Sequence, residues 1–221
     1  MSPWIHQAKT RMVELVDGVQ QEHPNTRIRV GFIGYRDYGD TVPLIEIPFQ
    51  NAHETMAEIQ PIQADGGDDI AEDIANGLFR ALHMDWSESD VKIVFHIADA
   101  PAHGTMFHGI RISDRYPRGD PNGLDPRDSV EKMSFLDINF TFVKINDSTD
   151  TMIDQFHNAY AHGGSFSVID LRPQTRYTRM DALDLGPRVG AMESDPTILS
   201  EALTRSVTQS IAQHYTTLPA S

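Results

Sequence analysis

Apolar positions recur along the chain with two periods, three to four residues in some segments and two residues in others. Residues 2–19 have apolar side chains at helical spacing and begin with a Ser-Pro pair that is typical of a helix start. Alternation then predicts a strand over 28–32 and a hairpin or edge partner over 43–49. Pro43 and Pro48 favour an edge position for that partner, because proline cannot donate a hydrogen bond to a neighbouring strand.

Helices and strands continue to alternate through the rest of the chain. The pattern predicts helices over 52–59, 72–84, 129–136, 151–160 and from 195 onward, and strands over 91–98, 140–145 and 165–171. This alternation indicates an α/β fold with a doubly wound, mostly parallel sheet, one antiparallel edge strand and helices on both faces. Residues 172–195 show no period and are expected to form an irregular surface excursion within a single domain of residues 1–221.

Composition narrows the classes of partner. The 221 residues carry a formal charge of −14 at pH 7, which argues against a nucleic-acid backbone or an anionic membrane surface as the partner. The chain has no cysteine, so disulfides, thiolate metal sites and cysteine nucleophiles are excluded. It has no apolar run of the roughly 20 residues that span a bilayer, and because charges interrupt the apolar residues of its first 16 positions we expect no signal peptide there. We therefore expect a cytoplasmic protein whose partners are neutral or basic molecules or divalent cations.

Acidic residues gather at three places in the predicted topology. One group follows the first strand at 36–40, a second precedes a helix at 65–73, and Asp99 ends the strand over 91–98. Ligands of α/β sheets bind beyond the carboxyl ends of the strands, so the three groups are expected at one rim. Carboxylates gathered there repel one another unless a cation lies among them, and oxygen ligands select magnesium, calcium or manganese. The alternative is that Asp99 caps a turn and that Asp73 only favours a helix macrodipole.

Three histidines surround Asp99 and suggest a zinc site as an alternative. His96 precedes Asp99 by three residues in the strand, so alternation directs the two side chains to opposite faces, and we interpret His96 as a core residue. His103 and His108 stay candidate loop ligands. The sequence has no GxSxG nucleophile elbow and no glycine-rich phosphate loop with a lysine, which argues against serine-hydrolase and phosphate-binding chemistry.

Four longer motifs occur in a fixed order: GFIGYRDYGD, GGDDIAEDIANGL, KIVFHIADAPAHG and DRYPRGDPNGLD. Together they resemble the von Willebrand factor A (vWA) domain associated with alpha-kinases, and the likeness covers nearly the whole chain. The resemblance implies a Rossmann-like vWA fold with a metal-ion-dependent adhesion site at one end of the sheet. It implies that Asp99 is the fourth-strand aspartate of that site, and that Asp68 or Asp69, with Glu72, supplies the second-loop ligands.

The resemblance also implies a difference at the N-terminus. In the family a first, central strand leads into a DxTGSM-like loop that supplies the DxSxS-type metal ligands, and Met1 of this chain stands where the methionine of that loop would be. The chain is therefore expected to be N-terminally truncated, without the central strand and its ligands. Strands beside a missing strand keep unpaired backbone groups, each costing about 1–3 kcal/mol if buried. Binding of Mg²⁺, Mn²⁺ or Ca²⁺ is accordingly expected to be weak or lost.

Three functions follow as hypotheses from these observations. The leading one is a non-catalytic protein-interaction module of vWA type, in which an acidic side chain of a partner protein completes the coordination of a magnesium-like ion. The family would place an alpha-kinase domain beside such a module, and this chain has no kinase signature, so we expect no enzymatic activity from it. The alternatives are a metallohydrolase that uses Asp99, His103 and His108, and a structural vWA remnant without a ligand. Unpaired strand edges would also invite self-association.

Overall fold

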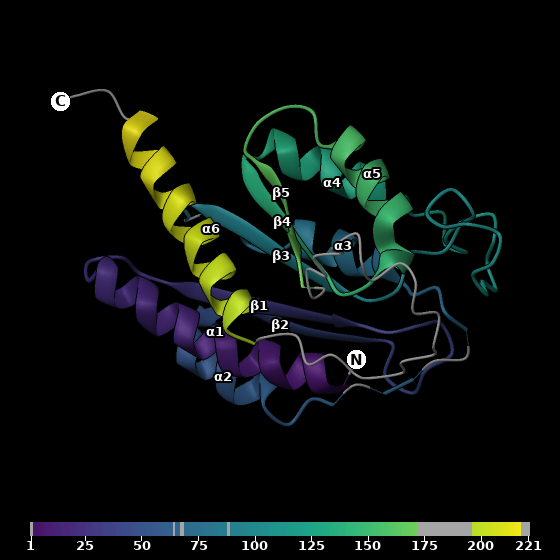
Figure 1. Cartoon of the computed structure of the whole chain (residues 1–221), viewed down its shortest axis with the longest axis horizontal. Coiled ribbons are helices and arrows are strands. Elements are labelled where there is room, and N and C mark those ends of the chain that lie inside the picture. The colour runs from purple at the N-terminus through teal and green to yellow at the C-terminus, as the bar shows by residue number, and fades with distance from the viewer. Residues whose placement is uncertain (1, 64, 67–68, 88, 172–195, 218–221) are drawn as a thin grey trace, which may run out of the picture.

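The chain folds into helices and strands that alternate along the sequence (Figure 1). The structure is a computed structural model that describes residues 2–63, 65–66, 69–87, 89–171 and 196–217. The helices are α1 (Ser2–Glu22), α2 (Ala52–Ile59), α3 (Ile74–Leu82), α4 (Pro126–Phe135), α5 (Asp150–Ala159) and α6 (Pro196–Thr217), with a short 3-10 helix η1 (Asp147–Thr149). The strands are β1 (Arg29–Tyr35), β2 (Leu44–Asn51), β3 (Lys92–Ala98), β4 (Ile138–Lys144) and β5 (Phe166–Asp170). The predicted α/β class is confirmed.

Strands β3, β4 and β5 form a parallel sheet in that order. Six of the seven residues of the middle strand β4 are buried, as is typical of a parallel strand that is covered by helices on both faces. Phe140 and Phe142 of β4 pack in one apolar core with residues of α3, α4 and α5. Val143 packs in a second core with residues of α1 and α6. Alternate residues of a single strand thus anchor two layers of helices.

Strands β1 and β2 form a separate antiparallel pair. The register places Tyr35 of β1 opposite Leu44 of β2 at the end near the connecting turn. Ile47 of β2 packs in an apolar core with residues of α2 and α1. Helix α3 also contacts β1, where the close approach of Gly77 to the ring of Tyr35 leaves no room for a larger side chain.

The two sheets are not paired with each other. Strand β1 pairs only with β2 and strand β3 pairs only with β4, so each keeps one edge without a partner strand among the described residues. The sequence pattern predicted one mostly parallel sheet with an antiparallel edge strand, and the resemblance implied that its central strand is missing. Strand β2 does pair antiparallel with β1, but the described strands form two sheets rather than one. The reason is that none of the described strands pairs with both β1 and β3.

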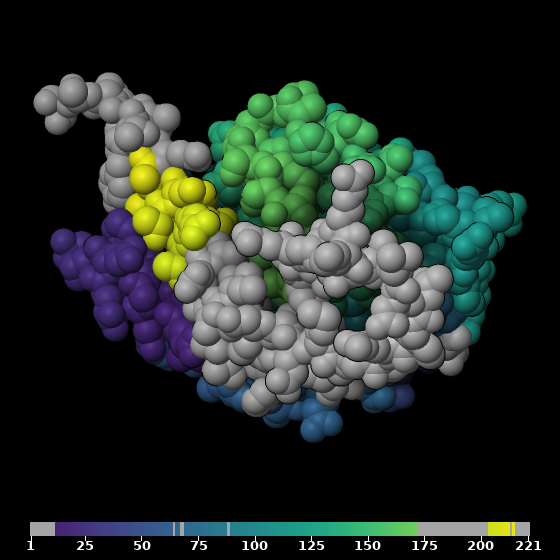
Figure 2. All heavy atoms as spheres, in the orientation of Figure 1, coloured from purple at the N-terminus to yellow at the C-terminus, as the bar shows by residue number. Residues whose placement is uncertain are grey.

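Helices α1 and α6 lie side by side, and Figure 2 shows α6 in yellow against α1 in purple. Leu15 and Val19 of α1 share an apolar core with Leu203 and Ile211 of α6 and with residues of the parallel sheet. Met12 of α1 belongs instead to the core under the β1–β2 pair. Helix α1 therefore packs against both sheets.

Two predicted elements begin earlier than the periodicity indicated. The helix predicted over 129–136 begins at Pro126, because the side chain of Asp125 caps its first turn and proline suits the first helical position. The strand predicted over 140–145 begins at Ile138. Such shifts are ordinary, because apolar periodicity marks the middle of an element better than its ends.

Two further predictions concern residues 172–195 and the absence of a membrane-spanning helix. The irregular excursion predicted at 172–195 lies outside the described residues. Among the helices that the structure describes, none combines the length and the apolar character needed to cross a membrane.

Candidate metal centre

The carboxyl ends of β1 and β3 lie at the same end of the molecule. Arg29 at the start of β1 donates a hydrogen bond of 3.0 Å to the hydroxyl of Ser89, which lies just before β3. Tyr35 at the end of β1 contacts His96 in β3, with 2.9 Å between the phenol oxygen and Nε2. The start of β1 therefore lies near the start of β3, and the end of β1 lies near the end of β3, so the two strands run in the same direction. The residues that follow each strand are thereby brought to one rim.

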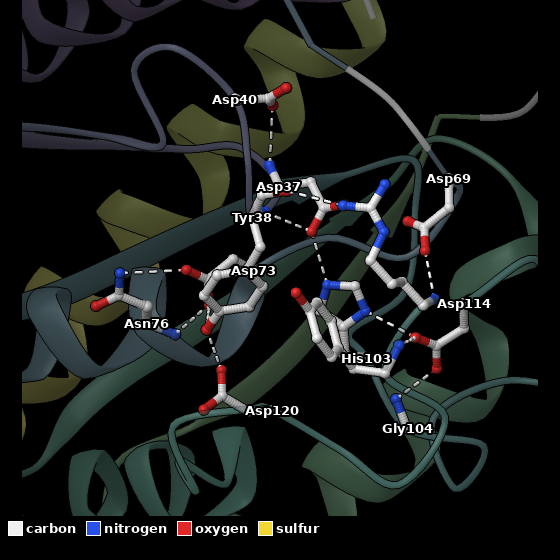
Figure 3. Close-up of polar contacts among 12 residues, drawn as sticks. Asp37, Tyr38, Asp40, Asp69, Asp73, Asn76, His103, Gly104, Asp114 and Asp120 are labelled. Carbon is white, nitrogen blue, oxygen red and sulfur yellow. Dashed lines mark hydrogen bonds and ion pairs between the residues drawn. The ribbon is translucent and has the colours of Figure 1, made fainter.

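A buried carboxylate, Asp37, follows β1 at this rim (Figure 3). The residue is 1% exposed. Its Oδ1 accepts hydrogen bonds from the amide of Tyr38 at 2.6 Å and from Nε2 of His103 at 2.7 Å. The amide of Asp37 donates to the carboxylate of Asp40 at 3.1 Å. The turn after β1 therefore fixes the direction of the Asp37 side chain.

His103 lies between two carboxylates (Figure 3). Its Nε2 faces Asp37, and its Nδ1 is 2.8 Å from Oδ1 of Asp114. Burial by itself lowers the pKa of His103, but the hydrogen bonds to Asp114 and Asp37 outweigh it, and the pKa is raised. An imidazole with a carboxylate at each nitrogen can satisfy both only when both nitrogens carry protons. His103 therefore keeps its positive charge to a higher pH than a free histidine does.

Asp114 joins His103 to a second buried histidine. Its Oδ2 accepts a hydrogen bond of 2.8 Å from the amide of Gly104 and lies 2.9 Å from Nε2 of His108. The other ring nitrogen of His108 is 2.9 Å from the carbonyl oxygen of Gly109. Burial raises the pKa of Asp114, but the hydrogen bonds to this carboxylate lower it overall. Asp114 is thus an ionised carboxylate that fixes the loop after β3.

Asp37, Asp69 and His103 form the candidate group, the one cluster of potential metal ligands that the described residues bring together. One ligand atom from each residue lies within 4.8 Å of the other two. Asp37 Oδ2 and Asp69 Oδ1 are buried and have no hydrogen-bond partner. Burying a carboxylate oxygen without a partner is unfavourable, so these two oxygens mark a place that suits a cation or a hydrogen-bond donor.

Asp69 reaches the candidate group from the segment before α3. Its Oδ2 accepts a hydrogen bond of 2.5 Å from the amide of Arg115, which fixes the carboxylate, and its Oδ1 is buried without a hydrogen-bond partner. Burial raises the pKa of Asp69, the hydrogen bond from Arg115 opposes this, and the negative charge of Asp37 adds to the increase. The balance indicates a carboxylate beside another negative charge.

Glu72 adds a further carboxyl group at the same rim. Its amide donates a hydrogen bond of 3.0 Å to the carbonyl of Pro101, which ties the segment before α3 to the loop after β3. Burial, followed by the negative charges of Asp37, Asp40 and Asp99, raises the pKa of Glu72 to about 7. A divalent cation at this rim would reduce the repulsion among these carboxylates and stabilise their ionised forms.

The chemistry of the donors favours a hard cation. His103 uses its nitrogens to hold Asp37 and Asp114, so the free donors of the candidate group are carboxylate oxygens. Mg²⁺, Mn²⁺ and Ca²⁺ bind such oxygens. Loss of the proton from Nε2 of His103 would add a nitrogen donor, and the set would then also suit zinc.

The four predicted metal ligands were Asp68, Asp69, Glu72 and Asp99. Asp69 belongs to the candidate group. Glu72 and Asp99 lie close enough for their charges to interact, and neither is in the candidate group. Asp68 lies outside the described residues. The structure thus brings one predicted ligand into the candidate group and two others to the same rim.

Asp73 supports the start of helix α3, in agreement with its interpretation as a helix-start residue rather than a metal ligand. It is the N-cap of α3, and its Oδ1 accepts hydrogen bonds from the amide of Asn76 at 3.2 Å and from the hydroxyl of Tyr38 at 2.9 Å. These contacts position the turn after β1 against the start of α3 (Figure 3).

His96 is a core residue, as strand alternation predicted. It is 4% exposed, and burial lowers its pKa to about 3, so the ring is neutral. Its Nε2 contacts Tyr35, and its Nδ1 is buried without a partner. In this position His96 holds β1 and β3 together from one face.

The three residues of the metallohydrolase hypothesis are arranged differently from that hypothesis. His103 and His108 both contact Asp114. Among the described residues, Asp99 and His108 do not join His103 in a cluster of metal ligands. The two histidines instead form a hydrogen-bonded network that fixes the loop after β3.

Sequence reasoning missed two residues of this network as site residues, Asp37 and Asp114. Asp37 lay in the acidic group at 36–40, and its position two residues after Tyr35 was a usable signal, since the carboxyl ends of parallel strands form binding rims. Asp114 opens the motif DRYPRGDPNGLD in a loop with no periodicity. Nothing local to that loop indicated that it folds back onto His103.

Comparison with known proteins relates most of the chain to one curated protein. A stretch of 160 residues is 37% identical to the protein named alpha-protein kinase vwkA of Dictyostelium discoideum. The alignment covers 71% of this chain and 25% of that protein, so the chain spans about a quarter of the length of its relative. No family model matches the chain. The similarity therefore relates this chain to one region of vwkA.

Proposed function

We propose that the chain is a non-catalytic protein-interaction module of vWA type that holds a divalent cation beyond the carboxyl ends of β1 and β3. The similarity to alpha-protein kinase vwkA agrees with the resemblance of the four motifs to the vWA domain associated with alpha-kinases. The α/β fold and the acidic rim are compatible with that resemblance. In a longer protein such a module would accompany an alpha-kinase domain.

The pair of unpartnered oxygens, Asp37 Oδ2 and Asp69 Oδ1, is the observation that carries this proposal. Both residues belong to the candidate group, and both of these oxygens are buried. A divalent cation between them would replace an unfavourable pair of buried acceptors by two metal–oxygen contacts. His103 would remain the residue that orients Asp37, through the hydrogen bond of 2.7 Å at Oδ1.

The cation would be the contact point for a partner protein. Asp69, Glu72 and Asp99 are half-buried, so part of the rim is accessible to solvent. Mg²⁺ usually keeps several water ligands when a protein supplies only one or two carboxylates, and a carboxylate from a partner can replace one of those waters. The proposal assigns no catalysis, because His103 has both nitrogens engaged and offers no free general base.

Titration with Mn²⁺, followed by its electron paramagnetic resonance signal, tests the metal site. With so few protein ligands we expect a dissociation constant of roughly 0.1–1 mM, and we expect Mg²⁺ to compete. Asp37→Asn keeps the shape of the side chain and removes its charge, so it should weaken binding at least about tenfold, which corresponds to about 1.4 kcal/mol. The matched control is Asp154→Asn, which makes the same change at an exposed position of α5.

The outcomes separate the hypotheses. Equal Mn²⁺ binding by the two variants, or no binding by the unmodified protein, would overturn the metal site and leave the structural remnant. Stoichiometric zinc that is lost in Asp37→Asn would favour a zinc centre and the hydrolase instead. The partner contact is tested by water-proton relaxation of the bound Mn²⁺: the tripeptide Gly-Asp-Gly should lower it by replacing a water, and Gly-Asn-Gly should not.

A further inference from the structure

A pocket of about 320 Å³ lies between the carboxyl-terminal ends of α3 and α4, which pack side by side (Figure 1). The described residues that line it are Leu82, His83, Lys132, Phe135 and Leu136. We call it the α3–α4 pocket. Its volume is at the low end of the range for ligand-binding pockets, which suits one large side chain better than a whole cofactor.

The α3–α4 pocket lies at the opposite end of the parallel sheet from the candidate group. The candidate group lies beyond the carboxyl ends of the strands, whereas Lys92 at the start of β3 donates a hydrogen bond of 3.2 Å to the carbonyl of Leu136. Leu136 also comes just before the start of β4. Helix α3 begins at the rim, and its nine residues span about 14 Å before it ends at the pocket. The pocket is therefore a surface separate from the proposed metal contact.

Two apolar side chains of the pocket are exposed. Phe135 is 60% exposed and Leu136 is 46% exposed, and they are neighbours in the sequence. The other nine phenylalanines of the chain are buried or half-buried. Single exposed apolar residues are ordinary on a protein surface, but adjacent ones that line a pocket are typical of an interaction site.

Ring contacts fix two walls of the pocket. The ring of Phe135 stacks on the imidazole of His162, with 3.6 Å between the centroids and an angle of 19° between the planes. The ring of His83 packs on that of Phe79 at 4.2 Å, and its Nδ1 is 2.7 Å from the carbonyl oxygen of Phe79. Side chains that are already held in place lose little freedom when a ligand binds.

The pocket is basic in a chain that is strongly acidic. The chain carries a formal charge of −14 and has only four lysines, of which Lys132 lines the pocket and Lys92 lies at its edge. None of the lining residues is acidic, and Lys132 has no ion pair with another residue that the structure describes. Glu131 faces His162 instead, at 3.5 Å. Lys92 offsets the partial negative charge at the end of α4, so a carboxylate is the charged group that suits the pocket.

We propose that the α3–α4 pocket is a second interaction surface, which binds an acidic segment of a partner protein through one aromatic side chain. The aromatic ring would pack against Leu82, Phe135 and Leu136, and a carboxylate next to it in the segment would lie beside Lys132. Aromatic side chains bury the largest apolar area and are frequent anchors of protein interfaces. A second copy of the chain suits the pocket less well, because both copies carry a charge of −14. This surface goes beyond the metal contact and needs no metal ion.

The acidic peptide Glu-Asp-Trp-Asp-Glu, with fluorotryptophan as its tryptophan, is a suitable probe. Fluorine NMR of the peptide measures its binding to the full chain, and EDTA is present so that its carboxylates cannot bind through a metal ion. Two unlabelled peptides are tested as competitors. Glu-Asp-Ser-Asp-Glu lacks the aromatic anchor, and Gln-Asn-Trp-Asn-Gln keeps the anchor and lacks the charges.

With one anchor and one ion pair we expect a dissociation constant of roughly 0.1–1 mM for the acidic peptide. The serine peptide and the neutral peptide should each compete at least about fivefold more weakly than the unlabelled acidic peptide. Amide signals of residues 82–83 and 132–136 should shift when the acidic peptide binds.

Two variants with matched controls test the residues of the pocket. Lys132→Glu should weaken binding at least about threefold, whereas Arg205→Glu makes the same change in net charge at an exposed position of α6 and should bind as the unmodified protein does. Phe135→Ala should weaken binding at least about fivefold. Its control is Ile110→Ala, at a site 94% exposed, which should leave binding unchanged. Because Phe135 is itself exposed, its variant should keep the fold.

Several results would overturn the proposal. Equal binding by Lys132→Glu and Arg205→Glu, or equal competition by the neutral peptide, would show that the pocket does not select acidic partners. Equal competition by the serine peptide would remove the aromatic anchor. Amide shifts confined to other residues would place the peptide elsewhere, and no binding by the unmodified protein would refute the surface. Shifts of the same residues that appear on dimer formation without peptide would assign the pocket to a second copy.

Discussion

The raised pKa of Glu72 predicts that the metal-free protein becomes less stable as the pH rises. Burial and the charges of Asp37, Asp40 and Asp99 raise this pKa from an ordinary value of 4.5 to about 7. Below pH 4.5 Glu72 is protonated in the folded and the unfolded chain, and its pKa difference has no effect. Between 4.5 and 7 the unfolded chain releases the proton first, so the free energy of unfolding falls with rising pH. Above pH 7 the full loss is present.

The size of the effect follows from the same values. A pKa difference of this size corresponds to about 3 kcal/mol between the two protonation states. Glu72 is only half-buried, and solvent screening reduces the expected loss to about 1–2 kcal/mol. The neutral Glu72→Gln variant lacks the proton equilibrium and should lack this part of the pH dependence.

Urea unfolding in the presence of EDTA at pH 5 and pH 8 measures the difference. The unmodified protein should lose about 1–2 kcal/mol more than Glu72→Gln between these pH values. His103 has a raised pKa, and its contribution to stability also falls as the pH rises, but it is common to both proteins and cancels in the comparison. Glu54→Gln, at an exposed position of α2, should follow the unmodified protein. The reasoning fails if Glu72→Gln retains the whole pH dependence.

Two further predictions concern the packing that positions the rim, and both are measured by urea unfolding. Phe156→Ala removes a fully buried ring from the core beside β4 and should lower the free energy of unfolding by about 3–5 kcal/mol, whereas Phe135→Ala at a site 60% exposed should change it by less than about 0.5 kcal/mol. A smaller loss for Phe156 than for Phe135 would contradict the assigned core. Gly77→Ala puts a Cβ 2.6 Å from the ring of Tyr35, and this clash should lower the free energy of unfolding by about 1–3 kcal/mol. The better helix propensity of alanine should offset about 1 kcal/mol of that loss. The control Gly18→Ala in α1 meets no atom within 4 Å and should stabilise by about 1 kcal/mol, so a gain at both glycines would refute the close contact.

The fold class could be predicted because its signal is local. Strand β4 shows this well: a short run of aromatic and β-branched residues between two helical segments reads as a buried strand, and Phe140 and Phe142 indeed lie in the core. The division of the strands into two sheets could not be read from periodicity, and only the resemblance to the vWA domain implied a missing central strand with unpaired neighbours. Which edge of a strand has a partner depends on residues far away in the sequence, and Val94 in β3 carries no local mark of it.

The candidate site shows the same limit. Asp99 and Asp69 were found because acids beside apolar runs mark the carboxyl ends of strands and the starts of helices. The contact between His103 and Asp37 joins residues 66 positions apart, and that between His103 and Asp114 joins residues 11 positions apart across an irregular loop. Neither spacing belongs to a periodic element, so His103 was predicted as a loop ligand and its role between two carboxylates was not.

A purely structural network and a cation site differ in whether the buried carboxylate oxygens all have hydrogen-bond partners. Asp114 illustrates the first, since both of its oxygens have hydrogen-bond partners and its loop is fixed by them. Asp37 and Asp69 differ, because each has one oxygen fixed by the protein and one that is buried without a partner. The cationic form of His103 balances only one of the two carboxylates it touches, and Glu72, whose pKa is raised to about 7, adds a further negative charge when it ionises. Carboxylates that the protein fixes through one oxygen, and that keep the other oxygen buried without a hydrogen-bond partner, suit a cation better than a network that only holds loops.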